Sequence, residues 1–421
     1  MKDLWRTEKH IFVNDKNLDN LCWLSKNLYN YCNYIIRQIY TNKFDNISEY
    51  KHLIKSFVYN EKVYYIIKEY DLIKELTKQN QVDYRMLPPQ TSQQIIKELY
   101  VNWKSFNKSM KEYVVNSNKF RGKPKMPNYK KKNGRSAVIF TNQQARLHNG
   151  FITFPKKVNL KSLRTKVSNI CQVRILPQAT CNVIEVVYKK EVIEHELDNN
   201  LYVGIDLGVN NLATLTSNKQ GMIPLLINGR SLKSINQYFN KKLAKLHSFV
   251  GNKGTSNRIR KLIHKRNNKV FTYLHKTSRI IIDYCVENQI GIIVIGYNKE
   301  WKIEVNLGKA NNQNFVGIPF NTLVKQIEYK AEENGIKTVR QEESYTSKCD
   351  FLANEDICNH NKYKGKRIKR GLFKSFIGKT INADVNGSLN IIKKAFPESF
   401  ANGIEGIEYC PIKVNTFIKE I

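Results

Sequence analysis

Apolar positions between residues 18 and 39 recur at steps of three and four, the spacing of one buried helix face. They are Leu18, Leu21, Leu24, Leu28, Tyr31, Ile35 and Ile39, and Asn17 before them is the expected helix cap. A second stripe follows the segment LPPQT and comprises Ile95, Leu99, Trp103, Phe106 and Met110. Both stripes indicate ordinary helical core, and residues 15–118 are assigned to a helical lobe.

The pattern changes to short β-rich runs between residues 136 and 196, each bounded by turn residues. The runs are AVIFT, FITFP, CQVRILP and CNVIEVVYKK. They predict a small barrel or sheet, which the strand-like segment HIFVN near the start of the chain can join. Residues 1–14 and 119–196 are therefore assigned to one β-rich module, with the helical lobe inserted into it.

From residue 197 onward, strand and helix patterns follow one another in the order β-β-β-α-β-α-β-α. The expected strands are 201–207, 211–216, 222–227, 291–295 and 336–341, and the expected helical regions are 231–288, 320–334 and a last one after Asp384. This is the order of an RNase H-like domain, in which helices flank a mixed sheet. The fold class predicted for the whole chain is multidomain α+β, with this domain at 197–421.

The charge of the chain points to its partner. Lys and Arg number 70 against 36 Asp and Glu, which gives a formal net charge of +34. Self-repulsion on this scale opposes compaction unless a polyanion neutralises it, so nucleic acid is the expected partner. A membrane surface is the rival partner, but no stretch approaches the roughly 18 apolar residues of a membrane span.

Two basic segments are candidates for phosphate contact. KFRGKPKMPNYKKKNGR, residues 119–135, contains Pro and Gly and reads as an extended loop. Phe120 and Tyr129 within it favour a stacking surface for a nucleic-acid strand, although a solvated loop is the alternative. The second segment, residues 258–281, combines an apolar stripe with a basic face that suits a heteroduplex channel or is simply solvated. The candidate residues are Arg121, Lys123, Lys125 and Lys130 in the first segment and Arg258, Lys261, Lys265 and Arg266 in the second.

Two aspartates stand where a metal-dependent nuclease needs them. Asp206 ends the apolar run LYVGID, and Asp384 precedes the last apolar helix in NADVNGSLNI. Mg²⁺ takes hard oxygen ligands, and carboxylates from separate strands and helices can hold it. Each aspartate also has an ordinary alternative role: Asp206 as acceptor for the turn at 208–211, and Asp384 as the cap of its helix.

The segments GIDLGVNNLATLTSN, IIVIGYNKEWK, SYTSK and NADVNGSLNI resemble the RuvC nuclease domain of the TnpB family. These transposon-encoded nucleases are related to Fanzor proteins and to compact type V CRISPR effectors. The resemblance implies an enzyme guided by an RNA from the end of its transposon, which cuts double-stranded DNA beside a short element-adjacent motif. It implies Mg²⁺, as two ions or with Mn²⁺ in its place, held first and last by Asp206 and Asp384. It also implies that the helical lobe and β-rich module are recognition and wedge domains.

The middle metal ligand of the family is missing at its usual place. Most relatives end the strand at 291–295 with a glutamate, where this chain has Gly296. Glu342 and Glu343, at the end of the next strand, are the best substitutes, as in a branch of the family with a relocated glutamate. Adjacent strand residues point to opposite faces, so only one can serve, and Glu343 is preferred. Both could instead be solvated, and the lower-ranked substitutes are Glu300 and Glu304.

The interval between SYTSK and Asp384 also departs from the family. Relatives carry two CxxC zinc knuckles there, whereas residues 345–382 offer Cys349, Cys358 and His360, so a four-ligand zinc site is not expected. The interval instead carries the basic run 362–374. Lys366, Arg367 and Arg370 are candidates for holding nucleic acid by its phosphates, with a plain charged loop as the alternative.

Eight cysteines without a CxxC pair, and an N-terminal segment without an apolar run of signal-peptide length, indicate a reducing, intracellular compartment. That would be the cytoplasm in a bacterium, or the nucleus or a viral factory in a eukaryotic or viral setting. Two other functions remain open: a nucleic-acid-binding regulator of transposition with a defunct site, and an unguided structure-specific nuclease.

Overall fold

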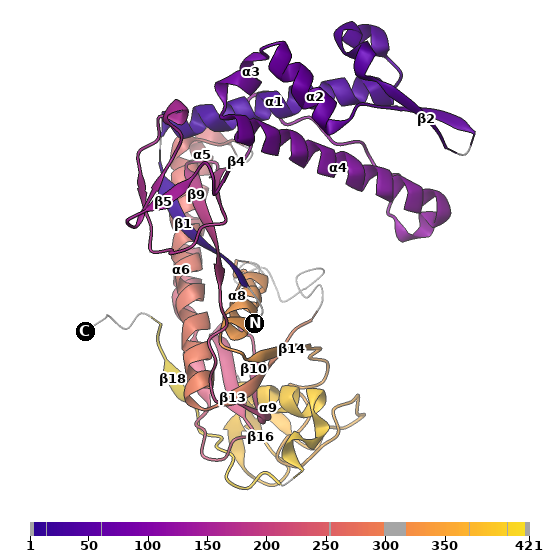
Figure 1. The fold of residues 1–421 in the computed structure, drawn as a ribbon. Coiled ribbons are helices and arrows are strands. Elements are labelled where there is room, and N and C mark those ends of the chain that lie inside the picture. The colour runs from indigo at the N-terminus through magenta and orange to yellow at the C-terminus, as the bar shows by residue number, and fades with distance from the viewer. Residues whose placement is uncertain are drawn as a thin grey trace. The chain divides into compact units, whose positions relative to one another are not determined.

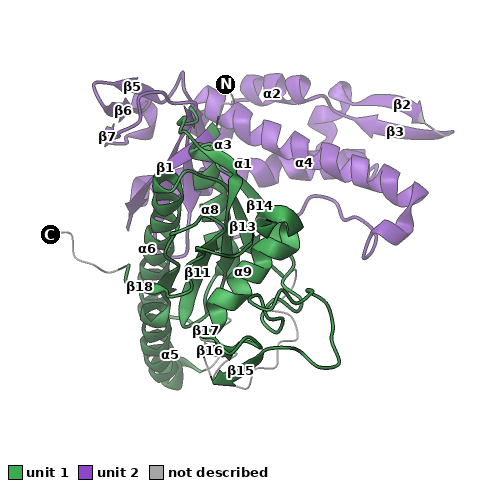
Figure 2. Cartoon of the chain, turned by 90° about the horizontal axis from the view of Figure 1, so that it is seen from below, with its two compact units in different colours: residues 1–4, 191–421 green, residues 5–190 purple. Residues whose placement is uncertain are grey.

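The computed structural model describes residues 4–13, 15–59, 61–251, 254–298, 317–369, 371–401 and 403–416. The chain divides into two compact units, residues 5–190 and residues 191–421 together with the first four residues (Figure 2). The boundary lies a few residues before the one predicted at 196. The helical lobe and the β-rich module, which the sequence pattern separated, share one unit and one hydrophobic core.

Two long helices dominate unit 5–190, namely α1 (Lys16–Tyr40) and α4 (Pro89–Val115), and they pack along each other (Figure 1). The predicted cap at Asn17 is wrong, because Asp15 accepts hydrogen bonds from the backbone N–H groups of Asn17 and Leu18 at 3.0 Å. The remaining helical-lobe elements are η1 (Phe44–Leu53), β2 (Lys55–Tyr59), β3 (Lys62–Ile66), α2 (Glu69–Lys78) and α3 (Val82–Met86).

The β-rich part of this unit contains two small sheets. One has the strand order β1-β9-β8-β4, so the N-terminal strand lies beside the last strand of the module. The other has the order β5-β6-β7. The bounds are β1 (Leu4–Phe12), β4 (Val138–Thr141), β5 (Arg146–His148), β6 (Phe151–Thr153), β7 (Leu163–Arg164), β8 (Gln172–Pro177) and β9 (Asn182–Lys190). No helix or strand longer than a three-residue 3-10 turn lies between Asn116 and Ala137, as expected for an extended basic loop.

Unit 191–421 is built on one mixed sheet with the order β14-β13-β10-β11-β12-β18. β10 pairs antiparallel with β11 and parallel with β13, and β13 pairs parallel with β14, which is the RNase H-like arrangement expected from the element order. The bounds are β10 (Asp198–Asp206), β11 (Asn211–Ser217), β12 (Leu225–Asn228), β13 (Ile290–Gly296), β14 (Lys337–Gln341) and β18 (Ile412–Val414). The helices are α5 (Arg230–Val250), α6 (Asn257–Glu287), α8 (Phe320–Glu333) and α9 (Ala383–Ala395).

Successive side chains of a strand point to opposite faces of this sheet, and different helices cover the two faces. Ile205 and Ile293 share a core with residues of α6 and α8, whereas Val294 packs with Ile391 of α9. Gly204, also on the α9 face, allows the close approach, because a Cβ there would collide with the backbone oxygen of Ser388. Even-numbered positions from residue 202 to 206 of β10 and from 292 to 296 of β13 therefore face α9, and Asp206 and Gly296 are among them.

Candidate active site

Asp206 and Asp384 are brought together by the start of α9. Asp206 ends β10, and Asp384 lies in the first turn of α9. Gly387 lies against the first aspartate, since a Cβ at that position would be 3.1 Å from Oδ2 of Asp206. Asn382 caps α9 by accepting from the backbone N–H of Asp384 at 2.8 Å, so the alternative role of Asp384 as the cap is wrong. The carboxylate of Asp384 is therefore not used to cap α9.

Glu343 lies beside Gly296, the position where the family resemblance predicts a middle glutamate. A Cβ at Gly296 would collide with Oε1 of Glu343, so this carboxylate fills the space beside the end of β13. Asn298 fixes the loop, because its Oδ1 accepts from the backbone N–H of Glu343 at 3.0 Å and its Nδ2 donates to Oε2 at 3.3 Å. A side chain at residue 296 and the observed position of Glu343 exclude each other.

Glu342 lies elsewhere. Its carboxylate is exposed, accepts from Nζ of Lys394 at 2.7 Å and from the backbone N–H of Ser344 at 2.9 Å. These partners, with the hydrogen bond to Lys394 first, lower the pKa of Glu342. The two neighbouring glutamates thus have opposite surroundings, and only Glu343 lies beside Gly296.

Burial and the negative charges of neighbouring acids raise the pKa values of Asp206 and Glu343. Burial, followed by the charge of Asp384, raises the pKa of Asp206 to about 7. Burial, followed by the charge of Asp206, raises the pKa of Glu343 to about 8. Oε1 of Glu343 is buried, and within the described part of the chain it has no hydrogen-bond partner. Carboxylates that disfavour each other's ionisation, with one oxygen unpaired, fit a divalent cation with hard oxygen preference.

Asn211 and Arg367 contact the carboxylate of Asp384. Nδ2 of Asn211 donates to Oδ2 at 2.7 Å, and the half-exposed Arg367 lies 3.5 Å from Oδ1. Among the residues that the structure describes, no three His, Cys, Asp or Glu side chains are already grouped closely enough to hold a metal ion. The carboxylate oxygens of these acids are donors of the type that Mg²⁺ prefers.

Carboxylate hydrogen bonds connect the described parts of the interval 345–382. It contains β15 (Lys366–Lys369), β16 (Leu372–Lys374) and β17 (Thr380–Asn382). The wholly buried Asp350 accepts from Oγ of Ser375 and from the backbone N–H of Phe376, both at 2.7 Å. Glu355 accepts from the backbone N–H groups of Asp350 and Lys364 at 2.8 Å. Carboxylate hydrogen bonds thus bridge residues 350–355 to Lys364 and to residues 375–376.

Two buried asparagines of α9 tie this interval to the acids. Asn386 donates to the backbone oxygen of Cys349 at 2.8 Å, and Asn390 donates to that of Thr346 at 2.9 Å. Oγ1 of Thr346 in turn donates to the backbone oxygen of Glu343 at 2.9 Å. The helix that carries Asp384 therefore also fixes the turn that carries Glu343.

The predicted phosphate-binding residues fall into two groups. The exposed group comprises Arg121, Lys123, Lys125, Arg258, Lys261, Lys265, Lys366 and Arg367. Lys130 is only partly exposed, and its Nζ lies 4.6 Å from the ring centroid of Tyr29. Arg266 differs, because its guanidinium donates to Oδ1 of Asn236 at 2.7 and 2.9 Å and to the backbone oxygen of Gly317. Its observed role is to join α5, α6 and the start of the segment before α8. Arg370, Glu300 and Glu304 lie outside the described residues.

Sequence reasoning missed four residues that shape the site: Asn211, Asn298, Gly387 and Asp350. Asn211 and Gly387 lie inside the motifs DLGVNN and DVNGSLNI, so their positions carried a signal. Asn298 follows Gly296 by two residues, and Asp350 follows Cys349. Neither had a pattern that assigned it a partner.

The strand order and the helix α9 on the face that carries Asp206 and Gly296 define unit 191–421 as an RNase H-like domain. Residues 185–302 match the family model OrfB_IS605, described as a probable transposase, and residues 320–391 match the Cas12f1-like TNB domain. The chain is thus related to the TnpB and Cas12f proteins through this unit, and the resemblance expected from the sequence is confirmed.

Individual relatives agree with the family models. The chain is 30% identical over 208 residues to the CRISPR-associated endodeoxyribonuclease Cas12f2 of Micrarchaeota archaeon (strain CG1_02_47_40), covering 46% of this chain and 36% of that protein. It is 26% identical over 208 residues to the TnpB-like protein ORF457 of Acidianus two-tailed virus, covering 47% and 42%. The matches thus span less than half the length of these relatives.

Among solved structures, a Cas12f1–sgRNA–target DNA complex aligns with a TM-score of 0.48 at 14% identity, over 92% of this chain and 98% of that one. The mini-RNA-guided endonuclease CRISPR-Cas_phi3 aligns with a TM-score of 0.44 at 9% identity, over 93% and 92%. Within the described residues, none of the helices combines the length and apolar character needed to cross a bilayer.

Proposed function

We propose that this chain is an RNA-guided DNA endonuclease of a transposable element, with Asp206, Glu343 and Asp384 as its metal ligands. The observation that carries the proposal is the position of Glu343 in the space beside Gly296. It supports a relocated middle ligand over a defunct site, because an acid without a function would not need a buried, unpartnered oxygen there.

The proposed chemistry is hydrolysis of a phosphodiester, leaving a 5′-phosphate and a 3′-hydroxyl. Bound Mg²⁺ would supply positive charge for the scissile phosphate and acidify an attacking water. The chain contributes three deprotonated carboxylates that hold the cations. Arg367, once released from Asp384, is free to contact a phosphate of the DNA backbone.

The proposed partners are a guide RNA from the transposon end and double-stranded target DNA, because the related Cas12f1 is described in complex with sgRNA and target DNA. The net charge of +34 supports such partners independently of the comparisons. The helical lobe and β-rich module are proposed as the recognition and wedge regions, which bind the guide and the element-adjacent motif.

The test is cleavage of plasmid DNA by the purified complex with its copurified RNA, in Mg²⁺. Asp206→Ala, Asp384→Ala and Glu343→Gln should each lose on the order of 100-fold or more in rate, since each removes metal-held transition-state charge. Glu342→Gln is the matched control and should cut like the wild type. Equal activity of Glu343→Gln and wild type would rule out the relocated ligand.

One observation favours the regulator alternative: the carboxylates are not grouped for a metal in the described structure, and Arg367 neutralises Asp384. A wild-type complex that binds DNA but does not cut it at any Mg²⁺ or Mn²⁺ concentration would support that alternative. Sequencing of the copurified RNA separates guided from unguided cleavage, because a guide has a defined scaffold and a variable 3′ end.

A further inference from the structure

The basic segment between α4 and β4 follows a fixed course over α1. Its central part, residues 124–132, is called the strap here. Asn30 exchanges two hydrogen bonds with the backbone of Lys130, at 2.8 and 2.9 Å, and Asn33 donates to the backbone oxygen of Pro127 at 3.0 Å. Nζ of Lys26 donates to the backbone oxygen of Lys132 at 2.9 Å. The backbone of the strap is therefore held along α1 despite the absence of regular secondary structure.

A cavity of about 450 Å³ lies between the strap and α4. This volume falls within the roughly 300–1,000 Å³ typical of small-ligand sites. Its walls combine an aromatic ring, amides, hydroxyls and a cation, namely Tyr129, Asn102, Asn128, Ser105, Ser109 and Lys125. A purely apolar ligand would leave these polar groups without partners, so the lining favours a flat ligand with polar edges and negative charge.

Tyr129 contacts Arg37 through its ring and remains partly exposed. The guanidinium of Arg37 lies 4.9 Å from its ring centroid, and the residue remains 44% exposed. Its ring is thus held in place while part of its surface stays open to the cavity. Every nucleobase offers a flat face for such a ring, and the exposed Lys125 nearby suits the attached phosphate.

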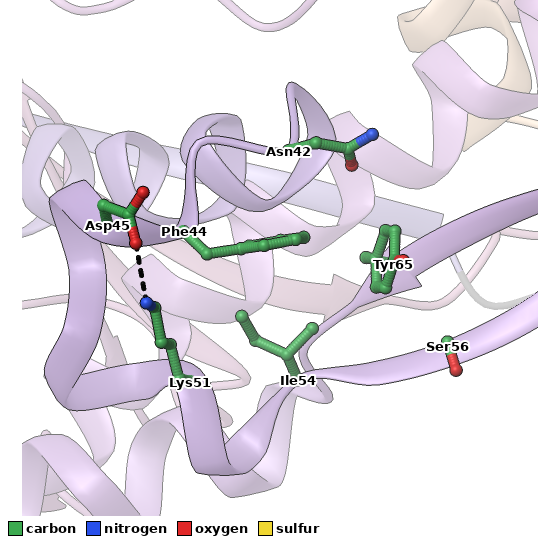
Figure 3. A pocket seen from close by; sticks show the side chains of 7 residues that line it. All are labelled: Asn42, Phe44, Asp45, Lys51, Ile54, Ser56 and Tyr65. Carbon is green, nitrogen blue, oxygen red and sulfur yellow. Dashed lines mark hydrogen bonds and ion pairs between the residues drawn. The ribbon is translucent and has the colours of Figure 1, made fainter.

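A second cavity in the same unit also has a lysine and aromatic rings in its walls, but these groups pair with one another or with protein side chains. It measures about 400 Å³ and lies at the base of the β2–β3 hairpin (Figure 3). Its lysine, Lys51, is paired with Asp45 at 2.7 Å, and the rings of Phe44 and Tyr65 pack edge to face at 4.9 Å. The cation and the aromatic surface of that cavity are therefore already engaged within the protein.

We infer that the cavity under the strap binds one unstacked nucleotide of a single nucleic-acid strand, with its base on Tyr129 and its phosphate at Lys125. The inference rests on the proposed function for the class of partner but not for cleavage. RNA and DNA strands share the required chemistry, so the source of the nucleotide is left to the experiment.

The experiment uses the full chain with Asp206→Ala, which removes cleavage from the readout. Oligo-uridine and oligo-thymidine strands carry one 2-aminopurine, whose fluorescence falls when its base stacks. Binding and quenching are measured for this protein and after adding Tyr129→Ala, Tyr129→Phe or Lys125→Glu. The matched controls are Tyr70→Ala and Lys74→Glu, which change exposed residues of α2.

Tyr129→Ala should weaken binding on the order of 10-fold and restore fluorescence, as expected for loss of one stacked base. Tyr129→Phe should keep the quenching, which also shows that the site folds, and Lys125→Glu should weaken binding more than Lys74→Glu does. A loss confined to one type of strand identifies RNA or DNA as the source. Unchanged quenching in Tyr129→Ala, or an equal loss in Tyr70→Ala, would overturn the inference whether or not the wild type cuts DNA.

Discussion

Gly296 and Glu343 compete for one space at the end of β13. A Cβ at residue 296 would collide with Oε1 of Glu343 and come within 2.6 Å of Cδ1 of Ile391. The absence of a side chain at Gly296 therefore leaves the space that the carboxylate of Glu343, which follows β14, occupies. This coupling can be measured without any assay of activity.

Gly296→Ala should lower the free energy of unfolding by about 2 kcal/mol, the usual cost of overpacking a buried site. In combination with Glu343→Gly, part of that cost should disappear, because one of the two collisions is removed. Urea denaturation of the wild type, both single variants and the double variant gives the interaction energy, which should be about 1 kcal/mol. Strictly additive effects would contradict the shared space.

The stability of the metal-free protein should fall as pH rises. Asp206 and Glu343 have pKa values raised from 3.8 to about 7 and from 4.5 to about 8, so the folded chain retains protons that the unfolded chain has already lost. Their stabilising contribution is complete below about pH 4 and is lost as pH passes through the raised values.

Thermal melting in a chelator between pH 5 and 8.5 checks this slope. Glu343→Gln should flatten it, because an amide does not titrate, whereas Glu342→Gln should leave the site's contribution in place. Added Mg²⁺ should stabilise the protein more at pH 8 than at pH 5, because protons compete with the cation for the carboxylates. An unchanged slope in Glu343→Gln would show that this carboxyl is not protonated in the folded state.

Arg367 competes with a cation for Asp384. Removing it in Arg367→Ala should lower the Mg²⁺ concentration needed for half-maximal cleavage by about two- to five-fold, in line with the roughly 0.2–1 kcal/mol of an exposed ion pair. The maximal rate should fall at the same time if the guanidinium contacts DNA. A Mg²⁺ titration of cleavage separates the two effects, with the exposed Lys379→Ala as control. A higher Mg²⁺ requirement would refute the competition.

Asp350 should be a stability determinant of the 345–382 interval. Asp350→Ala leaves Oγ of Ser375 and the backbone N–H of Phe376 without their partner, and should cost about 3 kcal/mol of unfolding free energy. Cys358→Ser should change stability little, and a zinc chelator should not alter the melting temperature of the wild type. Strong destabilisation by the chelator would mean that a metal closes the interval after all.

Substitutions of Arg266 and Lys265 should have different effects, the first on stability and the second on nucleic-acid binding. Arg266→Ala should destabilise the protein by about 2 kcal/mol, because the buried Asn236 loses a charged donor. Lys265→Ala should instead reduce the salt dependence of nucleic-acid binding by about one counterion, with little effect on stability. Binding isotherms at several salt concentrations and urea denaturation check both. A reduced salt slope in Arg266→Ala would return it to the phosphate-binding group.

The order of strands and helices was readable from the sequence because hydrophobic periodicity is a local property. Asp206 and Asp384 were readable because a charged residue at the end of an apolar strand, or at the start of an apolar helix, is unusual within its own segment. The preference for Glu343 over Glu342 required the parity of the strand, which a one-residue error in register would have reversed.

Contacts between distant segments were not readable. Asn298 and Glu343 are joined by hydrogen bonds across 45 residues, and Asp350 and Ser375 across 25. Common polar residues in these positions give no pattern that identifies a partner. The helix caps were also predicted wrongly. Asn17 and Asp384 were named from the sequence, whereas Asp15 and Asn382 are the observed caps. Several adjacent residues of similar type could have capped each helix, so the sequence did not distinguish them.

The bridge from Asp350 to Ser375 also determines what this protein needs from its surroundings. A knuckle built from cysteines folds only when the cell provides zinc, and it fails when its thiols are oxidised. The bridge from Asp350 to Ser375 is instead formed by a carboxylate, a hydroxyl and a backbone N–H, none of which is a thiol. If a zinc chelator leaves the melting temperature of the wild type unchanged, this part of the fold does not depend on the supply of that metal.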